Sequence, residues 1–523
     1  MIMSPPRPRP KLDQENTAFW TGGAEGELRI VHCGDCGQYT HPPRVLCRHC
    51  QSENIAASAV AGTGVIDTFT INHQPWAKDL PVPYVIARVA LDGVPGVYLT
   101  TNIVNCPVDA VAFGDPCASC SRNRTAYSIP LRASDLMARE AYITGVGQSE
   151  VGVRLTRHPL LLTLDAAKEA IAEAGLTFGQ IDGVFSFPGK VNGYLAFSPV
   201  GTDEVIEALG IKSKWQMGGM EQPAQLSAIG MAAWAVKQGI CRHVLCFRTV
   251  YEAGGMADPA TYMPPRPDTV SGASQWTSPF WATSAACWTA QYAARHVHKY
   301  GLTREQLGQI AINGSKNAML NPRARAITKA ELTLDTYMSA RMISTPLCLY
   351  DCDRFSDAST VVIVSAGDAL DEIKCEPIRI AAMSGSVDRY SWDQVEWPAA
   401  YDAGRDLWQH TDYTIDDVDT VQFYDGFAYL PITWLEGLGF CEKGEGGRFI
   451  EGGTRIARNG ELPLNTAGGQ LGAGRLHGFG FAHEAVTQLR GNAGERQIPG
   501  DPKVAVATSG GGPLAAALLL AKD

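Results

Sequence analysis

The chain has 523 residues, with 44 Lys and Arg against 54 Asp and Glu, and therefore a net charge of −10. At roughly 100–200 residues per domain, this length predicts about three domains, and the acidic balance argues against a nucleic-acid-binding protein, which needs a basic surface. Hydrophobic residues make up 45% of the chain and charged residues 19%, which is typical of a globular protein with a large core.

The N-terminal segment 1–17 is expected to be a disordered tail. It is rich in proline and carries basic residues, but it lacks the apolar stretch of a signal peptide. No apolar run of 18 or more residues occurs in the chain, so we expect no membrane span and a cytoplasmic protein.

Two CxxC pairs follow the tail, in HCGDCGQYTHPPRVLCRHC. Cys33 and Cys36 form one pair, and Cys47 and Cys50 form the other after ten intervening residues. Two such pairs can converge on one tetrahedral ion, so segment 18–55 is predicted to be a zinc ribbon. Because all four ligands are thiolates, no position stays open for water, and we expect a structural Zn²⁺.

A β-rich segment, 56–132, comes next and is typical of a small barrel or sheet. β-branched and apolar residues between glycine-bounded turns predict three strands there, at 62–73, 84–93 and 96–104. Cys117 and Cys120 form a further CxxC pair, but no second pair accompanies them, so we interpret them as ordinary cysteines.

Residues 18–130 resemble acyl-CoA-associated proteins that join a rubredoxin-like zinc ribbon to an OB-fold. The resemblance rests on CGDCGQYTHPPRVLCRHC and on the strands GTGVIDTFT and YVIARVALDG. Members of that family commonly partner thiolase-like enzymes and help to bind acyl-CoA, and the resemblance implies the same here.

The pattern then changes to alternating strands and helices, first over 137–370 and again over 377–523. In the first stretch we expect strands at 141–151, 181–187, 243–249 and 361–366 and helices at 159–175, 223–239, 283–300 and 303–320. In the second we expect strands at 378–385, 420–426 and 503–512 and helices at 428–439 and 483–491. Two successive α/β halves of unequal length suggest an internal duplication.

Residues 137–523 resemble the thiolase superfamily, and within it the lipid-transfer or sterol-carrier type. The segments that carry the resemblance are AYITGVGQSE, IDGVFSFPG, STPLCLYDCDRFSDAS, VQFYDGFAYLPITWLEGLGFCEKGE, LPLNTAGGQLGAGRLHGFGFAHEAVTQLRG and VATSGGGP. It implies a homodimer and two duplicated halves packed as a five-layer αβαβα sandwich. The expected architecture is therefore an α/β thiolase-like sandwich preceded by a zinc ribbon and an OB-fold β-barrel.

Both cysteines that a thiolase needs are missing. The nucleophile belongs at a helix N-terminus, where the helix dipole lowers its pKa, but the corresponding segment GGMEQPAQLSAIGMAAWAVKQG has no cysteine. The second position falls in ATSGGG, where Thr508 and Ser509 stand instead. We therefore expect no covalent acyl transfer through either position; a thiolase scaffold that has lost its activity is the alternative interpretation.

The second half keeps a polar motif, Tyr424-Asp425-Gly426-Phe427. A Tyr-Asp pair at this place resembles the thiolase-like retro-aldolases that cleave side chains from steroid acyl-CoAs. Such an enzyme removes the proton of a β-hydroxyl, breaks a carbon–carbon bond and leaves an enolate on the thioester. Tyr424 and Asp425 are the catalytic candidates, with Tyr424 as the base. The alternative is a tyrosine that only ends a strand.

The Gly-rich loop after this motif departs from those aldolases. The resemblance implies a second tyrosine two residues before a histidine, but here Arg475 precedes His477. His477 could protonate the enolate or donate to the thioester oxygen, and Arg475 could pair with a phosphate or a carboxylate. Tyr429 is a candidate stand-in for the missing tyrosine, whereas His483 is expected to be structural.

A last glycine loop and two Trp-rich segments complete the candidates. Gly510, Gly511 and Gly512 are expected to bring backbone N–H groups to the thioester, because glycine allows close approach. Segments 275–292 and 390–408 are expected in the core or at a subunit interface, with some of their rings lining an acyl pocket.

The first hypothesis is a lyase. It would cleave a β-hydroxyacyl-CoA with a steroid or aryl side chain to a ketone or aldehyde plus acetyl-CoA or propionyl-CoA. The alternatives are a thiolase-like acyltransferase with another nucleophile, and a non-catalytic acyl-CoA or lipid carrier. Coenzyme A then enters as part of the substrate, and a MaoC-like enoyl-CoA hydratase is a candidate partner.

Overall fold

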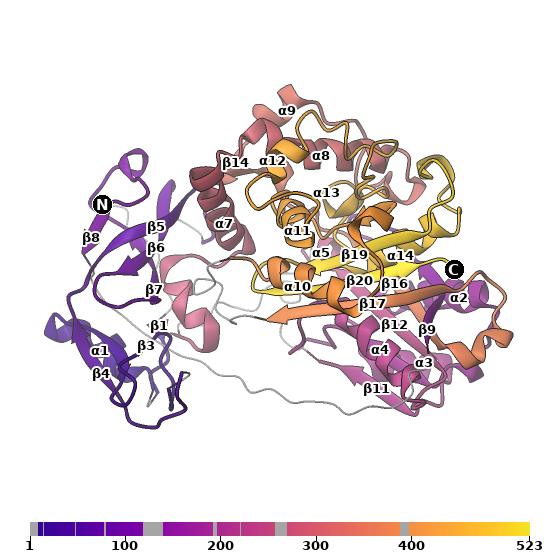
Figure 1. Ribbon diagram of the computed structural model, residues 1–523, viewed down its shortest axis with the longest axis horizontal. Coiled ribbons are helices and arrows are strands. Elements are labelled where there is room, and N and C mark those ends of the chain that lie inside the picture. Colours follow the sequence, from indigo (N-terminus) through magenta and orange to yellow (C-terminus); the bar gives the residue numbers. More distant parts are fainter. Residues whose placement is uncertain are drawn as a thin grey trace.

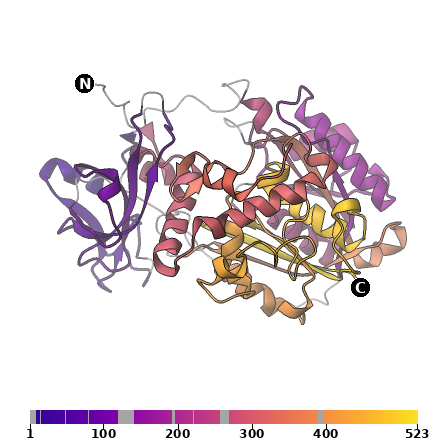
Figure 2. The same ribbon diagram turned by 90° about the horizontal axis from the view of Figure 1, so that it is seen from above.

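The computed structural model describes residues 9–13, 15–47, 49–77, 80–118, 140–191, 196–219, 221–256, 269–387 and 397–523. A smaller N-terminal module, drawn in indigo and violet, lies at one end of a larger α/β body (Figure 1). The view from above shows the same two parts side by side (Figure 2). Among the helices in these ranges, none is both long and apolar enough to cross a membrane.

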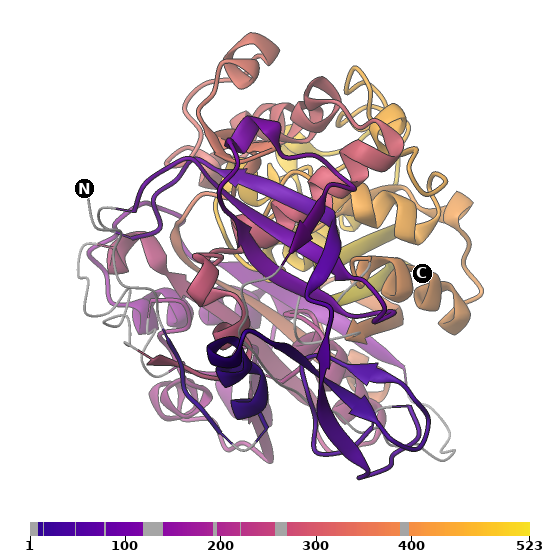
Figure 3. The ribbon, with the colours of Figure 1, turned by 90° about the vertical axis from the view of Figure 1, so that its left-hand side faces the viewer.

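The N-terminal module contains two sheets. An antiparallel sheet with the order β3-β2-β4 belongs to the zinc ribbon, and a second sheet, built on β5 to β8, faces the viewer in Figure 3. The three strands expected between residues 62 and 104 are β5, β6 and β7. The elements of the module are α1 Thr17–Gly22, β2 Leu28–Cys33, β3 Tyr39–Thr40, β4 Ile55–Val60, β5 Thr63–Asn72, β6 Tyr84–Leu91, β7 Tyr98–Ile103 and β8 Pro116–Ala118.

The body extends the second sheet of the module. β14 (Met342–Ser344) pairs with β5 and β15 (Leu347–Cys348) pairs with β14, which gives the order β15-β14-β5-β6-β7. Nearby, the indole of Trp20 stacks on that of Trp276, with 5.4 Å between ring centroids. A shared sheet and a stacked aromatic pair dock the module directly against the body.

Part of the expected disordered tail is ordered. β1 (Arg9–Pro10) pairs in parallel with β13 (Thr269–Val270), and Lys11 N donates to Val270 O at 2.7 Å. Proline favours extended backbone and is tolerated at a sheet edge, which suits such a short pairing. The expected disorder is therefore wrong for residues 9–13, and residues 1–8 lie outside the described ranges.

A nine-stranded sheet runs through the body in the order β11-β10-β12-β16-β9-β17-β20-β19-β18. In the first half β10 runs parallel to β12, and β16 lies antiparallel between β12 and β9. In the second half β18 runs parallel to β19, and β20 lies antiparallel between β19 and β17. The repeated order, β10-β12-β16-β9 and β18-β19-β20-β17, shows the duplication that the sequence suggests. The strands are β9 Ala141–Gln148, β10 Gly183–Ser186, β11 Trp215–Gly218, β12 His243–Tyr251, β16 Asp357–Ala366, β17 Ile378–Val387, β18 Thr420–Gln422, β19 Val504–Gly510 and β20 Leu514–Ala521.

Helices cover the sheet in three layers. α2 and α3 pack on the outer face of the first half, and α10 and α11 on the outer face of the second. α4 and α14 lie between the halves, in a core to which both half-sheets contribute. The body is therefore the expected five-layer αβαβα sandwich. The helices of the body are α2 Pro159–Ala174, α3 Thr202–Leu209, α4 Ser227–Lys237, α5 Glu252–Gly255, α7 Ala285–Tyr300, α8 Arg304–Met319, α9 Leu334–Met338, α10 Ala400–Leu407, α11 Leu430–Leu438, α12 Gly446–Phe449, α13 Gly469–Ala473 and α14 Phe479–Leu489.

Two strands of the second half differ from expectation. β18 ends at Gln422, not at residue 426, because the Asn465 side chain pairs with the Phe423 backbone: Phe423 N donates to Oδ1 (2.7 Å) and Nδ2 donates to Phe423 O (2.9 Å). β20 was not expected, since its Leu- and Ala-rich sequence favours a helix. It is a strand because it lies between β17 and β19 and is buried on both faces.

Candidate active site

The four cysteines of the zinc ribbon lie together. Their Sγ atoms are all within 4.8 Å of one another, with 3.6 Å between Cys33 and Cys50 and 3.4 Å between Cys36 and Cys47. Tetrahedral Zn–S bonds of about 2.3 Å place two sulfurs about 3.8 Å apart, so this cluster fits a zinc ion. The four thiolates hold a structural Zn²⁺, which stabilises the module.

The remaining CxxC pair shows no such cluster in the described residues. Cys117 Sγ lies 3.6 Å from the Gly64 carbonyl oxygen, and Cys120 lies outside the described ranges.

The catalytic candidates gather where the parallel strands of the two halves end. Arg248 lies near the end of β12 and Glu252 begins α5 directly after it, whereas Tyr424 follows β18. In open α/β sheets, ligand sites form beyond the carboxyl ends of such strands. The topology therefore brings polar side chains from both halves to one place.

Tyr424 is enclosed in this place. Its N–H donates to the Thr508 hydroxyl at 2.9 Å, and its ring contacts Phe481 with 6.1 Å between centroids. Burial raises the pKa of Tyr424 to about 12, while the Arg475 guanidinium and the Gln470 side chain act in the opposite direction. The phenol is thus protonated at neutral pH, and neighbouring donors favour its ionised form.

Asp425 holds the Gly-rich loop. It is 1% exposed, and its Oδ1 accepts from Gln470 N, at the start of α13, at 2.7 Å. Burial raises the pKa of Asp425 to about 7, and the N–H groups of Gln470 and Leu471 work against that rise. A carboxylate here satisfies the first N–H groups of the helix, so the geometry favours an anchoring role over the expected catalytic one.

His477 is a neutral hydrogen-bond donor. Its Nδ1 lies 2.8 Å from Arg248 Nη2, and a guanidinium can only donate, so Nδ1 must accept. Burial, followed by Arg475 and Arg248, holds the pKa of His477 well below its ordinary value. The ring proton therefore sits on Nε2, and donation to an oxygen suits His477 better than delivery of a proton from an imidazolium.

Arg475 is held by two carboxylates of the chain. Its Nη1 lies 3.2 Å from Glu252 Oε1 and its Nε 3.0 Å from Asp353 Oδ2. Burial raises the pKa of Asp353 to about 6, and Arg475 opposes the rise. The carboxylate partners of Arg475 thus come from the chain itself, in Glu252 and Asp353. A contact between Arg475 and a phosphate of the substrate stays a prediction.

The two thiolase cysteine positions meet at the N-terminus of α4. Leu226 N donates to Ser509 Oγ at 3.1 Å. A Cβ on Gly478 would lie 2.9 Å from Ser509 Cβ and 3.2 Å from Gln225 Cβ, so the loop after His477 reaches the same point. The hydroxyl of Ser509 is used to cap α4, and no thiol stands there.

A tight hairpin explains the last glycine loop. Gly510 and Gly511 have φ values of 70° and 121°, and Gly511 N donates to Leu514 O at 2.8 Å. Gly512 O accepts from Ala399 N at 2.7 Å. Because the Gly511 N–H is used inside the turn, the oxyanion role expected for Gly511 is wrong; the roles of Gly510 and Gly512 stay predictions.

Tyr429 lies in a different cluster. α11 begins directly after it, which turns the ring into the core, edge-on to His296 with 5.6 Å between centroids. His296 in turn pairs with Glu436 at 2.9 Å. Burial raises the pKa of Tyr429 well above its usual value. Within the described part of the chain Tyr429 has no hydrogen bond or ring contact with Tyr424, so it does not replace the missing tyrosine.

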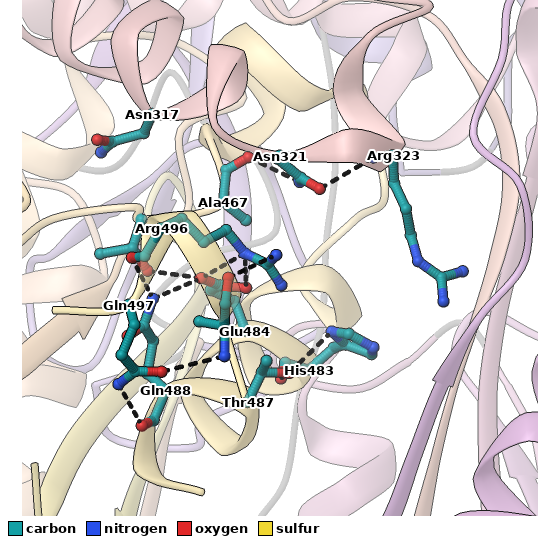
Figure 4. A network of polar contacts seen from close by, with 12 residues as sticks. Asn317, Asn321, Arg323, Ala467, His483, Glu484, Thr487, Gln488, Arg496 and Gln497 are labelled. Atoms are coloured by element: carbon teal, nitrogen blue, oxygen red, sulfur yellow. Dashed lines mark hydrogen bonds and ion pairs between the residues drawn. The ribbon is translucent and has the colours of Figure 1, made fainter. Parts of the chain in front are cut away.

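A polar network of side chains from α8, α14 and the segments after them holds the start of the Gly-rich loop (Figure 4). Asn321 Nδ2 donates to Ala467 O at 3.0 Å, and Arg496 pairs with Glu484 at 3.0 Å. His483 lies beside this network, with its Nδ1 3.5 Å from Thr487 Oγ1, and burial lowers its pKa to about 3. A cavity of about 320 Å³ lies between this network, α2 and the loop. His483 lines this cavity, and its expected structural role stays a prediction.

The first Trp-rich segment contributes to the interface between the N-terminal module and the body. Trp276 stacks on Trp20, and with Phe280 it lines a cavity of about 490 Å³ whose other walls belong mainly to the N-terminal module. In the second segment, residues 390–396 lie outside the described ranges. Trp408 packs into the core and donates from Nε1 to Leu438 O at 2.9 Å.

Four residues of the site were not singled out from the sequence: Arg248, Glu252, Asp353 and Gln470. They come from separate segments and carry no spacing motif, so only the folded chain brings them together. The one sequence signal is that Gln470 lies inside GGQLG, the segment that leads to His477.

Three family descriptions match the chain. A ChsH2 rubredoxin-like zinc ribbon domain matches residues 20–56, a ChsH2 C-terminal OB-fold domain matches 57–120, and a thiolase C-terminal domain-like family matches 386–520. The first two cover the N-terminal module, and the third covers the second half of the body.

The body is similar to a steroid side-chain-cleaving aldolase from Thermomonospora curvata, with 31% identity over 395 residues, 73% of this chain and 98% of that protein. The chain belongs to the family of steroid side-chain-cleaving aldolases. The present chain is also 31% identical to the 17-hydroxy-3-oxo-4-pregnene-20-carboxyl-CoA lyase of Mycobacterium tuberculosis. That match covers 68% of this chain and 93% of the lyase. The solved Ltp2-ChsH2(DUF35) aldolase matches the present chain with 30% identity and a TM-score of 0.65, over 73% of this chain and 98% of that one.

The aldolase is therefore a carbon–carbon lyase of the thiolase superfamily. Its zinc ribbon and OB-fold precede the catalytic body in the same chain.

Proposed function

We propose that this aldolase cleaves a β-hydroxyacyl-CoA with a steroid-type or aryl side chain. The products would be a ketone or aldehyde and a short acyl-CoA, acetyl-CoA or propionyl-CoA. One observation carries the proposal: a half-buried tyrosine, Tyr424, lies near Arg475 in a site where neither thiolase cysteine position holds a thiol.

The reaction needs one base and one donor. The ionised Tyr424 phenol accepts the β-hydroxyl proton, the bond between Cα and Cβ breaks, and the hydroxyl carbon becomes a carbonyl. The electron pair passes to the thioester as an enolate, whose oxygen accepts from the Nε2–H of His477. The phenol then returns its proton to Cα, so atoms and charge balance without an acyl-enzyme.

The test is a panel of β-hydroxyacyl-CoA substrates with steroid and aryl side chains, incubated without free CoA. Mass analysis should find a shortened acyl-CoA and an equal amount of the carbonyl product. No release across the panel would overturn the proposal.

The same assay separates the alternatives. An acyltransferase would need free CoA and leave an acyl adduct detectable by intact mass, and a carrier would bind acyl-CoA equally well after Tyr424→Phe. Ser509, one of the two hydroxyl residues at the second thiolase cysteine position, accepts a hydrogen bond from Leu226 N at the start of α4.

Association with a second copy is part of the proposal. In the described chain, the edge strand β11 pairs only with β10. Trp234 is 44% exposed and contacts Trp215, and Met383 is 40% exposed. An unpaired edge beside exposed apolar side chains supports a homodimer. A MaoC-like hydratase would supply the β-hydroxyacyl-CoA in the cytoplasm, and co-elution on size exclusion would test both associations.

A further inference from the structure

One glutamine contacts Asp425, which follows the proposed base, and His477, the proposed donor. Gln470 N donates to Asp425 Oδ1 at 2.7 Å, and Gln470 Oε1 accepts from His477 N at 3.0 Å. The side chain is 2% exposed, and its Nε2 has no hydrogen-bond partner among the described residues. A buried amide N–H without an acceptor destabilises the folded chain, so a nearby oxygen that can accept from Nε2 would be favoured.

The orientation of this amide is fixed. His477 has a φ of 47°, a left-handed conformation uncommon outside glycine, and its N–H needs an acceptor. Oε1 provides it, and a flipped amide would set two donors against each other. Nε2 must therefore face away from the His477 backbone.

Tyr424 directly precedes Asp425, whose Oδ1 accepts from Gln470 N at 2.7 Å, so the phenol belongs to a residue next to this contact. The Gln470 side chain is one of the groups that lower the pKa of Tyr424 against the effect of burial. The charged groups that face the same phenol come from three further segments: Arg475 lowers its pKa, and Asp353 and Glu252 raise it.

We propose that Gln470 is a positioning residue for the cleavage reaction. Its carbonyl oxygen fixes the backbone of His477, and its Nε2–H donates to the Tyr424 oxygen once the phenol ionises. This inference rests on the proposed function, because it needs Tyr424 as the base. It adds that base and donor are held together by a single side chain.

The test uses the full-length chain with a fluorinated tyrosine at position 424, whose phenol ionises within the measurable pH range. In this background Gln470→Met keeps the side-chain length but removes the donor. Because a donor stabilises the phenolate, its loss should move the midpoint of the rise in kcat with pH upward by roughly one unit. At a fixed pH below the midpoint, kcat should fall about tenfold while KM stays the same.

Gln422→Met is the matched control. Gln422 is also fully buried in the second half, but its Nε2 donates to Thr420 and Thr466 at 3.1 Å and not to the catalytic candidates. It should lower the melting temperature without moving the midpoint. If Gln470→Met likewise lowers the melting temperature but leaves the midpoint unmoved, Gln470 is only structural and the inference is overturned. If Tyr424→Phe leaves cleavage intact, the proposed function fails instead.

Discussion

The central helices α4 and α14 occupy equivalent places in the two halves of the body. Each lies between the half-sheets and leads into the equivalent strand of its half, β12 or β19. Their N-termini meet, because Ser509 at the end of β19 caps α4 and Gly478 at the start of α14 packs against Gln225. His477 stands before α14, whereas no nucleophile stands before α4. The duplicated fold therefore keeps both positions, but the chemistry belongs to the second half.

Replacing Tyr424, the proposed base in the second half, should have the largest effect on kcat. Tyr424→Phe removes the proton acceptor and should lower kcat for retro-aldol cleavage by about 10²–10⁴-fold, the usual worth of general base catalysis. Product release measured by mass spectrometry checks it.

Tyr429→Phe is the control for that experiment, because Tyr429 Oη has no hydrogen-bond partner within the described residues. Its removal should leave both kcat and stability near those of the parent. Equal losses in the two variants would contradict the placement of the base at Tyr424.

The donor before α14 should have the next largest effect. His477→Ala removes the Nε2–H that would bind the enolate oxygen, and kcat should fall about 10²–10³-fold. Because the pKa of His477 is held well below its ordinary value, the ring stays neutral through the neutral pH range. The loss should therefore be the same at every pH tested there. A loss confined to acidic pH would show that the protonated ring acts instead.

Asp425, which anchors the Gly-rich loop, should make the stability of the folded chain depend on pH. Folding raises the pKa of Asp425 to about 7, whereas an unfolded aspartate ionises near 3.9, so between these values only the folded chain holds the proton. Stability should fall as pH rises through this window, by up to about 1.4 kcal/mol per pH unit.

Asp425→Asn cannot ionise and should remove that slope. Denaturant unfolding of both proteins at the two ends of the window measures it. Parallel stability curves would mean that Asp425 is charged throughout in the folded chain.

Short-range patterns predicted their parts of the molecule well. The spacing of Cys33, Cys36, Cys47 and Cys50 was enough for the metal cluster, since each pair sits on one turn of chain. Tyr424 and His477 were found from the motifs around them. The structure adds the hydrogen bond from His477 N to Gln470 and places Arg475 near both residues. The order of the layers followed from the resemblance and not from any single element.

Features that depend on distant contacts were missed. β20 has a helix-forming composition and is a strand only because two strands enclose it. Tyr429 is five residues from Tyr424, yet the start of α11 turns it into another cluster. Arg248 sets the tautomer of His477 from 229 positions away in sequence, which no local pattern could indicate.

Removing the hydrogen bond between Leu226 N and Ser509 Oγ, which joins the two halves, should have the smallest effect on stability and kcat. Ser509→Ala removes the hydroxyl that accepts from Leu226 N, which should cost about 1 kcal/mol of stability. If the position of the second thiolase cysteine is now only a cap, kcat should stay within about twofold of the parent, since a typical lost hydrogen bond outside the reacting groups leaves the transition state unchanged. Intact mass of parent and variant during turnover should show no acyl adduct. An adduct on Ser509, or a large loss of kcat in the variant, would mean that this position has kept its chemistry with oxygen in place of sulfur, and that the asymmetry between α4 and α14 is smaller than their sequences indicate.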